Sequence, residues 1–504
     1  MKRACARATT YLADAAMPAD PDQGCVPGAV ARCLMTSNIT FDAELLRRYD
    51  QPGPRYTSYP TAPAFVSGFG QVQLREQARR TNQEPIPRPL SIYVHVPFCF
   101  SPCFYCGCNR IITRDTSRSA PYLLRLAREI ELIAPWFDRD REVVQVHLGG
   151  GTPNFLRPEE IFELMQSLRA NFRLSAGAHR DFSIELDPRF LRTGDIASYA
   201  ALGFSRASFG VQDFDPVVQR AVNREQSVEQ TLQAIEDCRD SGFRSVNVDL
   251  IYGLPKQTSE GFGRTLDTVT GARPDRIAIY GYAHMPQIFK AQTQIDEADL
   301  PDPASKLGLL QLAIEKLGAA GYRHIGMDHF ALADDDLSRA QETGTLHRNF
   351  MGYTTHADCD LIGLGVSAIS HIGDSFSQNP RELPAWEIAI DQGQLPVWRG
   401  LELSFDDRVR ADVIQQLMCN AAIDIPAIEH RHEIEFWDYF SGSVLRLKRL
   451  ADDGLVEIGQ RSVTATSRGR LLLRIIAMCF DGYLNTSSVD IHAPGSRPRY
   501  SRVI

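Results

Sequence analysis

The 504-residue sequence lacks any stretch that approaches 18 uninterrupted apolar residues, which excludes an obvious membrane span. It also lacks a basic excess, because 54 Lys and Arg stand against 62 Asp and Glu, a net charge of −8. A nucleic-acid partner is therefore not expected, since proteins that bind polyanions usually carry excess positive charge. A secretory signal is poorly supported because Asp14 interrupts the only apolar run near the N-terminus. We expect a cytoplasmic, monomeric enzyme.

Cysteine is distributed unevenly along the chain. Four of the eleven cysteines lie within ten residues, at Cys99, Cys103, Cys106 and Cys108. In the reducing compartment that a chain without an export signal implies, structural disulfides are not expected. Clustered thiols there indicate metal or redox chemistry, whereas the isolated cysteines suit small core positions.

The length predicts two to four domains, at roughly 150 residues each. Residues 1–38 have no sustained hydrophobic period and read as a disordered leader. We expect an N-terminal segment at 39–89 that contacts a catalytic domain at 90–390, followed by an accessory domain at 391–504.

A repeating pattern of short apolar runs and helix-period segments begins near residue 90. Strands are predicted at 91–96, 143–148, 182–186, 206–211, 245–251 and 276–282. Helices are predicted at 121–136, 158–172, 228–241 and 261–270. Six βα alternations predict a parallel α/β sheet, either open or closed toward a barrel. We prefer an incomplete barrel, because the motifs described below follow the carboxyl ends of several strands.

The second half of the chain follows a different pattern. A helix is predicted at 303–318, and loop-rich sequence is expected around 327–349 and 363–373. Beyond about residue 400 the pattern is mainly helical, and residues 444–470 resemble a helix, a turn and a small β-wing. We expect a winged-helix-like accessory domain that packs on the barrel rather than on DNA, because it has no concentrated basic face.

The spacing Cys99-x3-Cys103-x2-Cys106 offers three thiolates from one tight loop. Cys thiolates ligate [4Fe–4S] clusters, and three local ligands leave one iron open to a small molecule. Zinc is the alternative, but structural zinc normally needs four ligands in two pairs, and no second pair is obvious. Redox thiols are a third interpretation. Cys108 as a fourth ligand would strain the geometry, since one residue separates it from Cys106.

This triad is the signature of radical S-adenosylmethionine (SAM) enzymes, and its surroundings resemble the oxygen-independent coproporphyrinogen III oxidase (coproporphyrinogen dehydrogenase) family. The resemblance runs from about residue 41 to the C-terminus. Its motifs are YVHVPFC at 93–99, CFYCGC at 103–108, GGGTP at 149–153, ELDP at 185–188, GVQDF at 210–214, VNREQ at 222–226, DLIYGLP at 249–255, YAHMP at 282–286, GMDHF at 326–330, LHRNF at 346–350 and GVSAIS at 365–370.

The resemblance implies an incomplete (β/α)6 radical-SAM barrel with an N-terminal extension and a mainly helical C-terminal domain. It also implies one [4Fe–4S] cluster, held by Cys99, Cys103 and Cys106, whose open iron chelates SAM, while Cys108 is not a ligand. The implied reaction is the oxidative decarboxylation of two propionates of coproporphyrinogen III to vinyl groups through a 5′-deoxyadenosyl radical. The product is protoporphyrinogen IX, and a low-potential electron donor and a final electron acceptor are required.

The family pattern implies two SAM sites. Positions around the first SAM match Tyr93, Glu185 and Ile369, and Gly150 matches a SAM-binding position in the glycine segment. Positions around the second match Tyr105, Gly151, Thr152, Gln212, Arg224, Asp249 and Ala283. Taken alone, the glycines could form only a tight βα turn, and Glu185 could be a solvated residue at a strand end.

Other roles are less specific in the sequence. A substrate with four carboxylates needs cationic anchors, for which Arg55 and Arg348 are candidates, although surface ion pairing explains both equally well.

The alternative function is a haem-binding chaperone of the wider family. That branch typically lacks the Cys-Gly-Cys ending and the RYTSYP segment, which are present here at 106–108 and 55–60. A protein that only transfers electrons would leave the glycine-rich motif unused.

Overall fold

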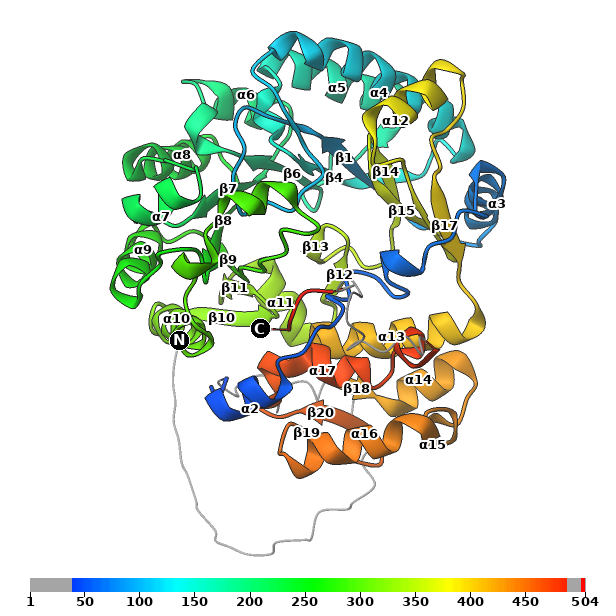
Figure 1. Ribbon diagram of the computed structural model, residues 1–504. Helices are drawn as coiled ribbons and strands as arrows, with labels where there is room; N and C mark the ends of the chain where they lie inside the picture. Colours follow the sequence, from blue (N-terminus) through cyan, green and yellow to red (C-terminus); the bar gives the residue numbers. More distant parts are fainter. Residues whose placement is uncertain (1–38, 487–499, 504) are drawn as a thin grey trace, which may run out of the picture.

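The computed structural model describes residues 39–486 and 500–503. The expected leader at 1–38 lies outside these residues. Most of the chain forms one large mixed sheet with helices along its outer side, and the C-terminal part forms a smaller helical unit beside it (Figure 1).

Six neighbouring parallel strands form the centre of the large sheet, in the chain order that the sequence predicts. They are β1 (Leu90–Val96), β4 (Glu142–Gly150), β6 (Asp181–Leu186), β7 (Arg206–Gln212), β8 (Ser245–Tyr252) and β9 (Arg276–Gly281). Each strand pairs in parallel with the next, so their carboxyl ends lie at one edge. The prediction of an α/β fold with this strand order is confirmed.

Helices cover the outer side of this sheet (Figure 1). They are α4 (Ser119–Ile133), α5 (Pro158–Asn171), α6 (Asp195–Ala201), α7 (Pro216–Ala221), α8 (Val228–Asp240), α9 (Ser259–Ala272) and α10 (Pro303–Ala319). Capping side chains fix the starts of α8 and α9: Ser227 accepts from Gln230 N, and Thr258 from Gly261 N. Buried residues such as Leu126 on α4 join the strands in one continuous core.

The sheet continues beyond the six strands on both sides, which the sequence did not predict. Beside β1 lie β14 (Asp360–Leu364), β15 (Ile369–Ile372), β16 (Ser375–Gln378) and β17 (Arg399–Glu402); beside β9 lie β11 (His329–Leu332) and β10 (Tyr322–Gly326). The expectation of loop-rich sequence at 327–349 and 363–373 was therefore wrong. These strands have only four or five residues, and β10, β14 and β17 contain glycine, so pairing across the sheet, rather than local pattern, determines them.

Two further elements flank this region. Helix α11 (Asp336–Thr343) follows β11, and the hairpin β12 (His347–Asn349) and β13 (Gly352–Thr354) lies between the sheet and the C-terminal unit (Figure 1). Helix α12 (Leu383–Asp391) contacts α4.

The C-terminal unit combines helices with a three-stranded sheet in the order β18-β20-β19, which agrees with a winged-helix-like arrangement. Its elements are α13 (Phe405–Asn420), β18 (Ala422–Asp424), α14 (Ile425–His432), α15 (Phe436–Tyr439), α16 (Ser441–Asp452), β19 (Val456–Ile458), β20 (Ser462–Ala465), α17 (Leu473–Met478) and α18 (Gly482–Thr486). It has its own hydrophobic core.

The N-terminal segment divides between the two units. Helix α2 (Ala43–Tyr49) buries Leu45 and Leu46 in the C-terminal core, whereas α3 (Gln71–Asn82) contacts β15 and β16 of the large sheet. This segment therefore contacts both units, and the domain boundaries given above remain a prediction.

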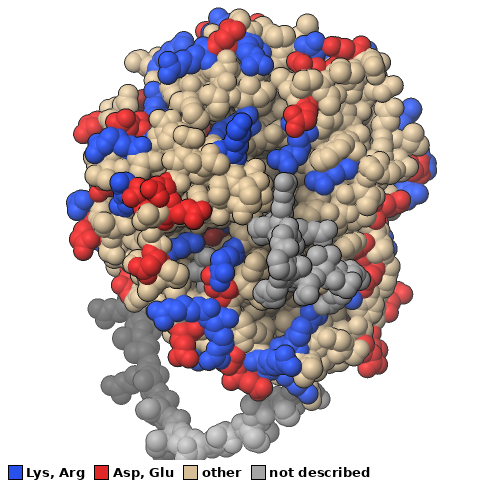
Figure 2. Space-filling model, in the orientation of Figure 1, with Lys and Arg blue, Asp and Glu red and all other residues tan. Residues whose placement is uncertain are grey.

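Charge on the face shown in Figure 2 is mixed, with Lys and Arg interspersed among Asp and Glu. Within residues 39–486 and 500–503, no helix combines the length and the apolar character needed to cross a membrane.

A buried ion pair joins the start of β14 to the turn before β4. Arg141 Nη2 donates to Asp360 Oδ2 at 2.5 Å, and the two side chains are 2% and 1% exposed. Arg141 also donates to Thr81 and Asn82 of α3, and Asp360 Oδ1 accepts from Gly373 N. The pair thus connects α3, β4 and β14.

We expect Asp360→Ala to lower the free energy of unfolding by about 3–5 kcal/mol, because it leaves a buried guanidinium without its counter-ion. Denaturant unfolding measures this loss. Asp391→Ala is the matched control: Asp391 is 54% exposed and pairs with Arg125, so its removal should cost under about 1 kcal/mol. Equal losses for the two variants would contradict the prediction.

Candidate active site

The cysteine loop begins at the carboxyl end of β1. Strand β2 (Phe98–Cys99) pairs with β3 (Ile111–Ile112) and closes the loop at its base. Cys99 and Cys103 are buried, Cys106 is half-buried and Cys108 is exposed. All four line a cavity of about 250 Å³ at the carboxyl-terminal edge of the parallel strands.

Each thiol of the triad receives a hydrogen bond. Thr152 Oγ1 donates to Cys99 Sγ at 3.4 Å, and Arg224 Nη1 to Cys103 Sγ at 3.6 Å. The Cys108 N–H donates to Cys106 Sγ at 3.4 Å. Such donors stabilise sulfur that carries negative charge, as a metal-bound thiolate does.

The thiols differ in acidity. A hydrogen bond from the Cys108 side chain lowers the pKa of Cys106 to about 6, and this effect outweighs burial. Burial raises the pKa of Cys99 to about 12. Cys108 donates rather than presenting a free thiolate, and its pKa is raised by that bond and by the charge on Cys106.

The arrangement of the side chains bears on whether the cavity could hold a single zinc ion or a [4Fe–4S] cluster. Within the described part of the chain, no three His, Cys, Asp or Glu side chains are arranged to hold a single metal ion. A cluster makes a different demand, since each thiolate binds its own iron. In addition, Ser101 Oγ and the Nε atoms of Arg110 and Arg224 line or adjoin the cavity and are buried without a partner among the described residues.

The glycine segment at the end of β4 lies against other parts of the chain. A Cβ on Gly150, whose φ is +111°, would lie 2.5 Å from the His95 ring, and one on Gly151 would meet the Pro97 and Phe98 backbone at 2.8 Å. A Cβ on Gly149 would meet the Glu185 carboxylate at 2.9 Å. The glycines are therefore required for close packing within the protein, while Gly150 and Gly151 also line the cavity.

Glu185 lies at the end of β6 within a hydrogen-bonded group. Its Oε2 accepts from Gly150 N at 3.1 Å, and its Oε1 lies 3.3 Å from His147 Nε2. Burial would raise its pKa, but these contacts hold it below the ordinary value. Tyr93 stacks on His147, with ring centroids 5.8 Å apart, and bonds His95 through its hydroxyl. Glu185 is thus an ionised residue at the cavity wall, fixed by these contacts, whose carboxylate accepts hydrogen bonds.

Arg224 is buried, and its guanidinium is held on two sides. Nη1 donates to Asp187 Oδ2 at 3.0 Å, and Nη2 donates to Gly210 O at 2.6 Å. Asp187 also binds Arg189, whose Nη2 lies 3.9 Å from Cys103 Sγ. Its ion-pair partner is therefore Asp187, which follows β6.

Asp249 on β8 accepts from Asn247 Nδ2 at 2.8 Å and from Ser208 Oγ at 3.1 Å. Burial raises its pKa to about 6, with a further contribution from the charge of Glu185, while both hydrogen bonds lower it. It lines both the cavity of about 250 Å³ that contains the cysteines, called the thiol cavity below, and a second cavity of about 150 Å³.

The structure brings most of the predicted site residues to one cavity. Those that line it are Cys99, Cys103, Tyr105, Cys106, Gly150, Gly151, Thr152, Glu185, Gln212, Arg224 and Asp249. Three others, Tyr93, Ala283 and Ile369, are not among the residues that line it. Tyr93 packs on His147, and Gln292 donates to the carbonyls of both Ala283 and Tyr105. Ile369 begins β15, one strand beyond β14.

Sequence reasoning missed the basic residues around the cluster loop. Arg110 donates to the Cys103 and Cys106 carbonyls at 3.2 and 3.1 Å, and Arg189 joins Asp187 beneath Cys103. Both adjoin recognised motifs, so a search for charged neighbours of the motifs could have found them. The substrate-anchor candidates lie elsewhere: Arg55 pairs with Asp328, and Arg348 donates to Arg55 O.

Comparison with known proteins agrees with this geometry. Residues 93–269 match the radical SAM superfamily, and residues 403–472 match the HemN C-terminal domain. An oxygen-independent coproporphyrinogen III oxidase from Pseudomonas aeruginosa is 49% identical over 473 residues, which cover 93% of this chain and 100% of the relative. The chain belongs to this family.

A coproporphyrinogen III oxidase of known structure supports the same family membership. The Escherichia coli enzyme, described as a radical SAM enzyme, superimposes with a TM-score of 0.84 at 46% identity, covering 88% of this chain and 100% of that one. Membership of the oxygen-independent coproporphyrinogen III oxidase family confirms the expected enzyme class and fold. It also implies a [4Fe–4S] cluster and SAM as cofactors.

A buried carboxylate supports the loop that leads to Ile369. Glu129 on α4 accepts from Gly365 N at 2.7 Å, from Asn379 Nδ2 at 2.7 Å and from Trp386 Nε1 at 3.2 Å. Burial raises its pKa to about 7 from the ordinary 4.5, although each of these donors lowers it.

We expect Glu129 to make folding stability depend on pH. Because its pKa is higher in the folded state, its contribution is full below pH 4.5 and is lost as the pH rises through about 7. The loss is at most about 3 kcal/mol. Unfolding free energies measured from pH 4.5 to 8 should therefore show a steeper decline for wild type than for Glu129→Gln. Glu131→Gln, exposed on the same helix, should keep the wild-type slope; an unchanged slope in Glu129→Gln would refute this role.

Proposed function

We propose that this chain decarboxylates two propionates of coproporphyrinogen III oxidatively to vinyl groups, without O₂, and so forms protoporphyrinogen IX for haem biosynthesis. The observation that carries the proposal is that three thiols and eight residues expected to bind SAM line one cavity. The name of the relatives, at 49% and 47% identity over at least 90% of the chain, supports the same reaction.

In this proposal Cys99, Cys103 and Cys106 hold one [4Fe–4S] cluster, and the cavity takes two SAM molecules. When bound, the reduced cluster and SAM supply a 5′-deoxyadenosyl radical that removes a hydrogen atom from the propionate β-carbon. Glu185 accepts hydrogen bonds from the first SAM, because its carboxylate is ionised and held by Gly150 N and His147. Thr152 keeps the Cys99 sulfur oriented.

The second SAM lies on the Arg224 side in this proposal. Arg224 offers an unpartnered Nε, and a guanidinium suits a carboxylate. Asp187 and Gly210 O fix the guanidinium plane, so ligand binding requires little reorganisation. Asp249, held by Asn247 and Ser208, supplies an acceptor across the cavity.

The haem-binding chaperone is less well supported. The Cys-Gly-Cys ending has a specific role here, since Cys108 donates to the Cys106 sulfur. The RYTSYP segment is built into the interior, where Tyr56 donates to Asp481 at 2.9 Å and the Tyr59 hydroxyl accepts from Gly482 N at 2.9 Å. The electron donor and the final acceptor are required by the reaction, and their chemistry is left open.

An anaerobic assay with coproporphyrinogen III, SAM and a low-potential reductant tests the proposal. Wild type should form protoporphyrinogen IX, and alanine at Cys99, Cys103 or Cys106 should abolish both SAM cleavage and iron binding, because each thiolate holds one iron. Cys108→Ala is the control and should retain the cluster. Iron loss confined to the Cys108 variant would reverse the ligand assignment, and a wild type that cleaves SAM but never converts the substrate would refute the function.

We further expect Arg224→Ala to bind the second SAM at least about 30-fold more weakly, because a buried charged partner contributes about 2–5 kcal/mol. Iron content should be unchanged, and little product should form. Arg224→Lys should restore binding poorly, since an ammonium cannot reproduce the bidentate fork.

Anaerobic equilibrium dialysis of SAM, beside iron analysis, measures these effects. Arg220→Ala is the matched control, because Arg220 is exposed on the preceding helix α7. A full cluster with one bound SAM in Arg224→Ala would support the assignment. Two bound SAM molecules and a normal product yield would contradict it.

A further inference from the structure

A group of three arginines lies between the barrel, the N-terminal segment and the C-terminal unit. Arg55 comes from the N-terminal segment, Arg348 from β12 and Arg474 from α17. They surround Asp328, which lies between β10 and β11. We call these four residues the arginine cluster.

Among the described residues, only one of the three arginines in the cluster, Arg55, has a carboxylate partner. Arg55 Nη2 donates to Asp328 Oδ2. Arg474 donates instead to backbone carbonyls, Pro54 O at 2.9 Å among them, and Arg348 Nη1 donates to Arg55 O at 2.9 Å. Within residues 39–486 and 500–503, neither Arg348 nor Arg474 forms an ion pair.

The arginine cluster therefore has three positive charges against one negative charge. The guanidinium groups hold the pKa of Asp328 below its ordinary value although burial would raise it. Buried charge without a counter-ion is costly, and proteins retain it mainly at functional sites. Arg348 Nε and the neighbouring His329 Nδ1 are also buried with no partner among the described residues, so donors remain available there.

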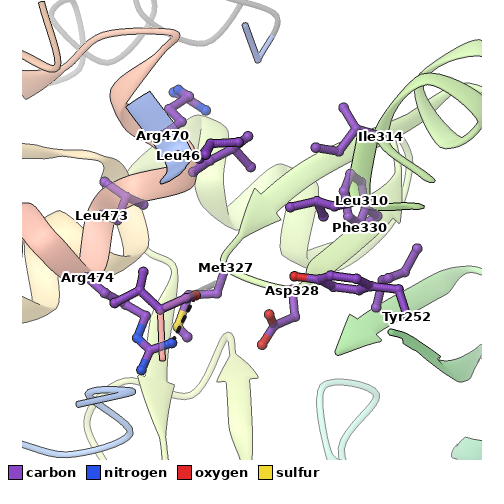
Figure 3. Close-up of a pocket in the computed structure, with 13 residues that line it drawn as sticks. Leu46, Tyr252, Leu310, Ile314, Met327, Asp328, Phe330, Arg470, Leu473 and Arg474 are labelled. Atoms are coloured by element: carbon purple, nitrogen blue, oxygen red, sulfur yellow. Dashed lines mark hydrogen bonds between the residues drawn. The ribbon is translucent and has the colours of Figure 1, made fainter. Parts of the chain in front are cut away.

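Cavities lie on both sides of the Arg55–Asp328 pair. On one side, Asp328, Arg474 and Tyr252 line a cavity of about 40 Å³ (Figure 3). On the other side, the Arg55 guanidinium carbon lies 5.6 Å from the centroid of Tyr280.

Tyr280 lines the cavity of about 150 Å³, which shares Glu185, Ser208 and Asp249 with the thiol cavity. Arg55, with 37% of its side chain accessible, thus lies against Tyr280, a wall residue of the cavity that adjoins the thiol cavity. A substrate that presents one propionate to the thiol cavity must direct others away from it. Those carboxylates need cations at a distance from the reacting carbon.

We propose that Arg55 binds a non-reacting propionate of the porphyrinogen, which displaces Asp328 from the ion pair. This inference rests on the proposed function, since it names a substrate subsite for it. Arg348 fixes the Arg55 backbone, and Arg474 adds positive potential. Asp328 is an internal competitor that pairs with Arg55 when no substrate is bound.

Two variants should change substrate affinity in opposite directions. Arg55→Gln should weaken binding of coproporphyrinogen III about 30-fold, because a charge-assisted contact is lost. Asp328→Asn should tighten it about 3- to 10-fold, because the competitor no longer occupies Arg55. If the pair were only structural, both variants would weaken binding or leave it unchanged.

Anaerobic equilibrium dialysis with coproporphyrinogen III measures the affinity without requiring turnover. The matched control is the exposed pair Arg48–Asp453, which joins α2 to the C-terminal unit: Arg48→Gln and Asp453→Asn should leave affinity within about twofold. Arg55→Lys keeps the charge and should give an intermediate affinity. With the tetramethyl ester of the substrate, wild type and Arg55→Gln should bind alike, since the carboxylate is absent.

Iron content and substrate-free SAM cleavage should match wild type in every variant, which separates this subsite from the cluster chemistry. Two results with coproporphyrinogen III itself would overturn the inference: weaker binding by Asp328→Asn than by wild type, or equal binding by wild type and Arg55→Gln. A wild type that binds coproporphyrinogen III but forms no product would refute the proposed function alone, because the comparison of affinities would still stand.

Discussion

Strand register determines which polar side chains can satisfy one another inside the barrel. Burying a polar group without a hydrogen bond is costly, so inward-facing polar residues need partners on the next strand. Register places Tyr93 beside His147, and His147 beside Ser183, whose hydroxyl lies 2.7 Å from His147 Nδ1. It likewise places Ser208 beside Asn247, which binds it at 2.9 Å. A slip of one residue would break every pair.

This constraint explains how the site is supported. Glu185 does not depend on its own strand alone, because β4 supplies both His147 and Gly150 N. Asp249 depends in the same way on β7 through Ser208. The residues that face the cavity are thus held by partners on neighbouring strands, as metal and cofactor sites usually require.

Local pattern was sufficient to predict the six central strands and the main helices, because long apolar runs and capped amphipathic segments carry strong signals. Local pattern was insufficient to predict the short strands β14 to β17, which depend on pairing with neighbouring strands of the sheet. Gly363 is one example: a Cβ there would lie 2.4 Å from the Ile369 carbonyl, so the residue is determined by a neighbouring strand.

The candidate site likewise combines residues that local pattern predicts with residues that it does not. The thiol triad and the glycine segment are contiguous in sequence and could be predicted. The pair of Arg224 with Asp187 joins residues 37 positions apart, and the Arg55–Asp328 pair spans 273 positions. Sequence separation of that size gives no local signal, so the neighbours of both arginines follow only from the fold.

Net charge is a poor guide to the interior for a related reason. The chain carries −8 overall, yet the arginine cluster contains three guanidinium groups and one carboxylate. Exposed charges are screened within about 10 Å at moderate salt, whereas enclosed charges are screened much less. An enclosed positive group can therefore attract a carboxylate that the acidic exterior repels only weakly. The acidic composition argues against extended polyanions on the surface, and it does not argue against a small anionic substrate within the fold.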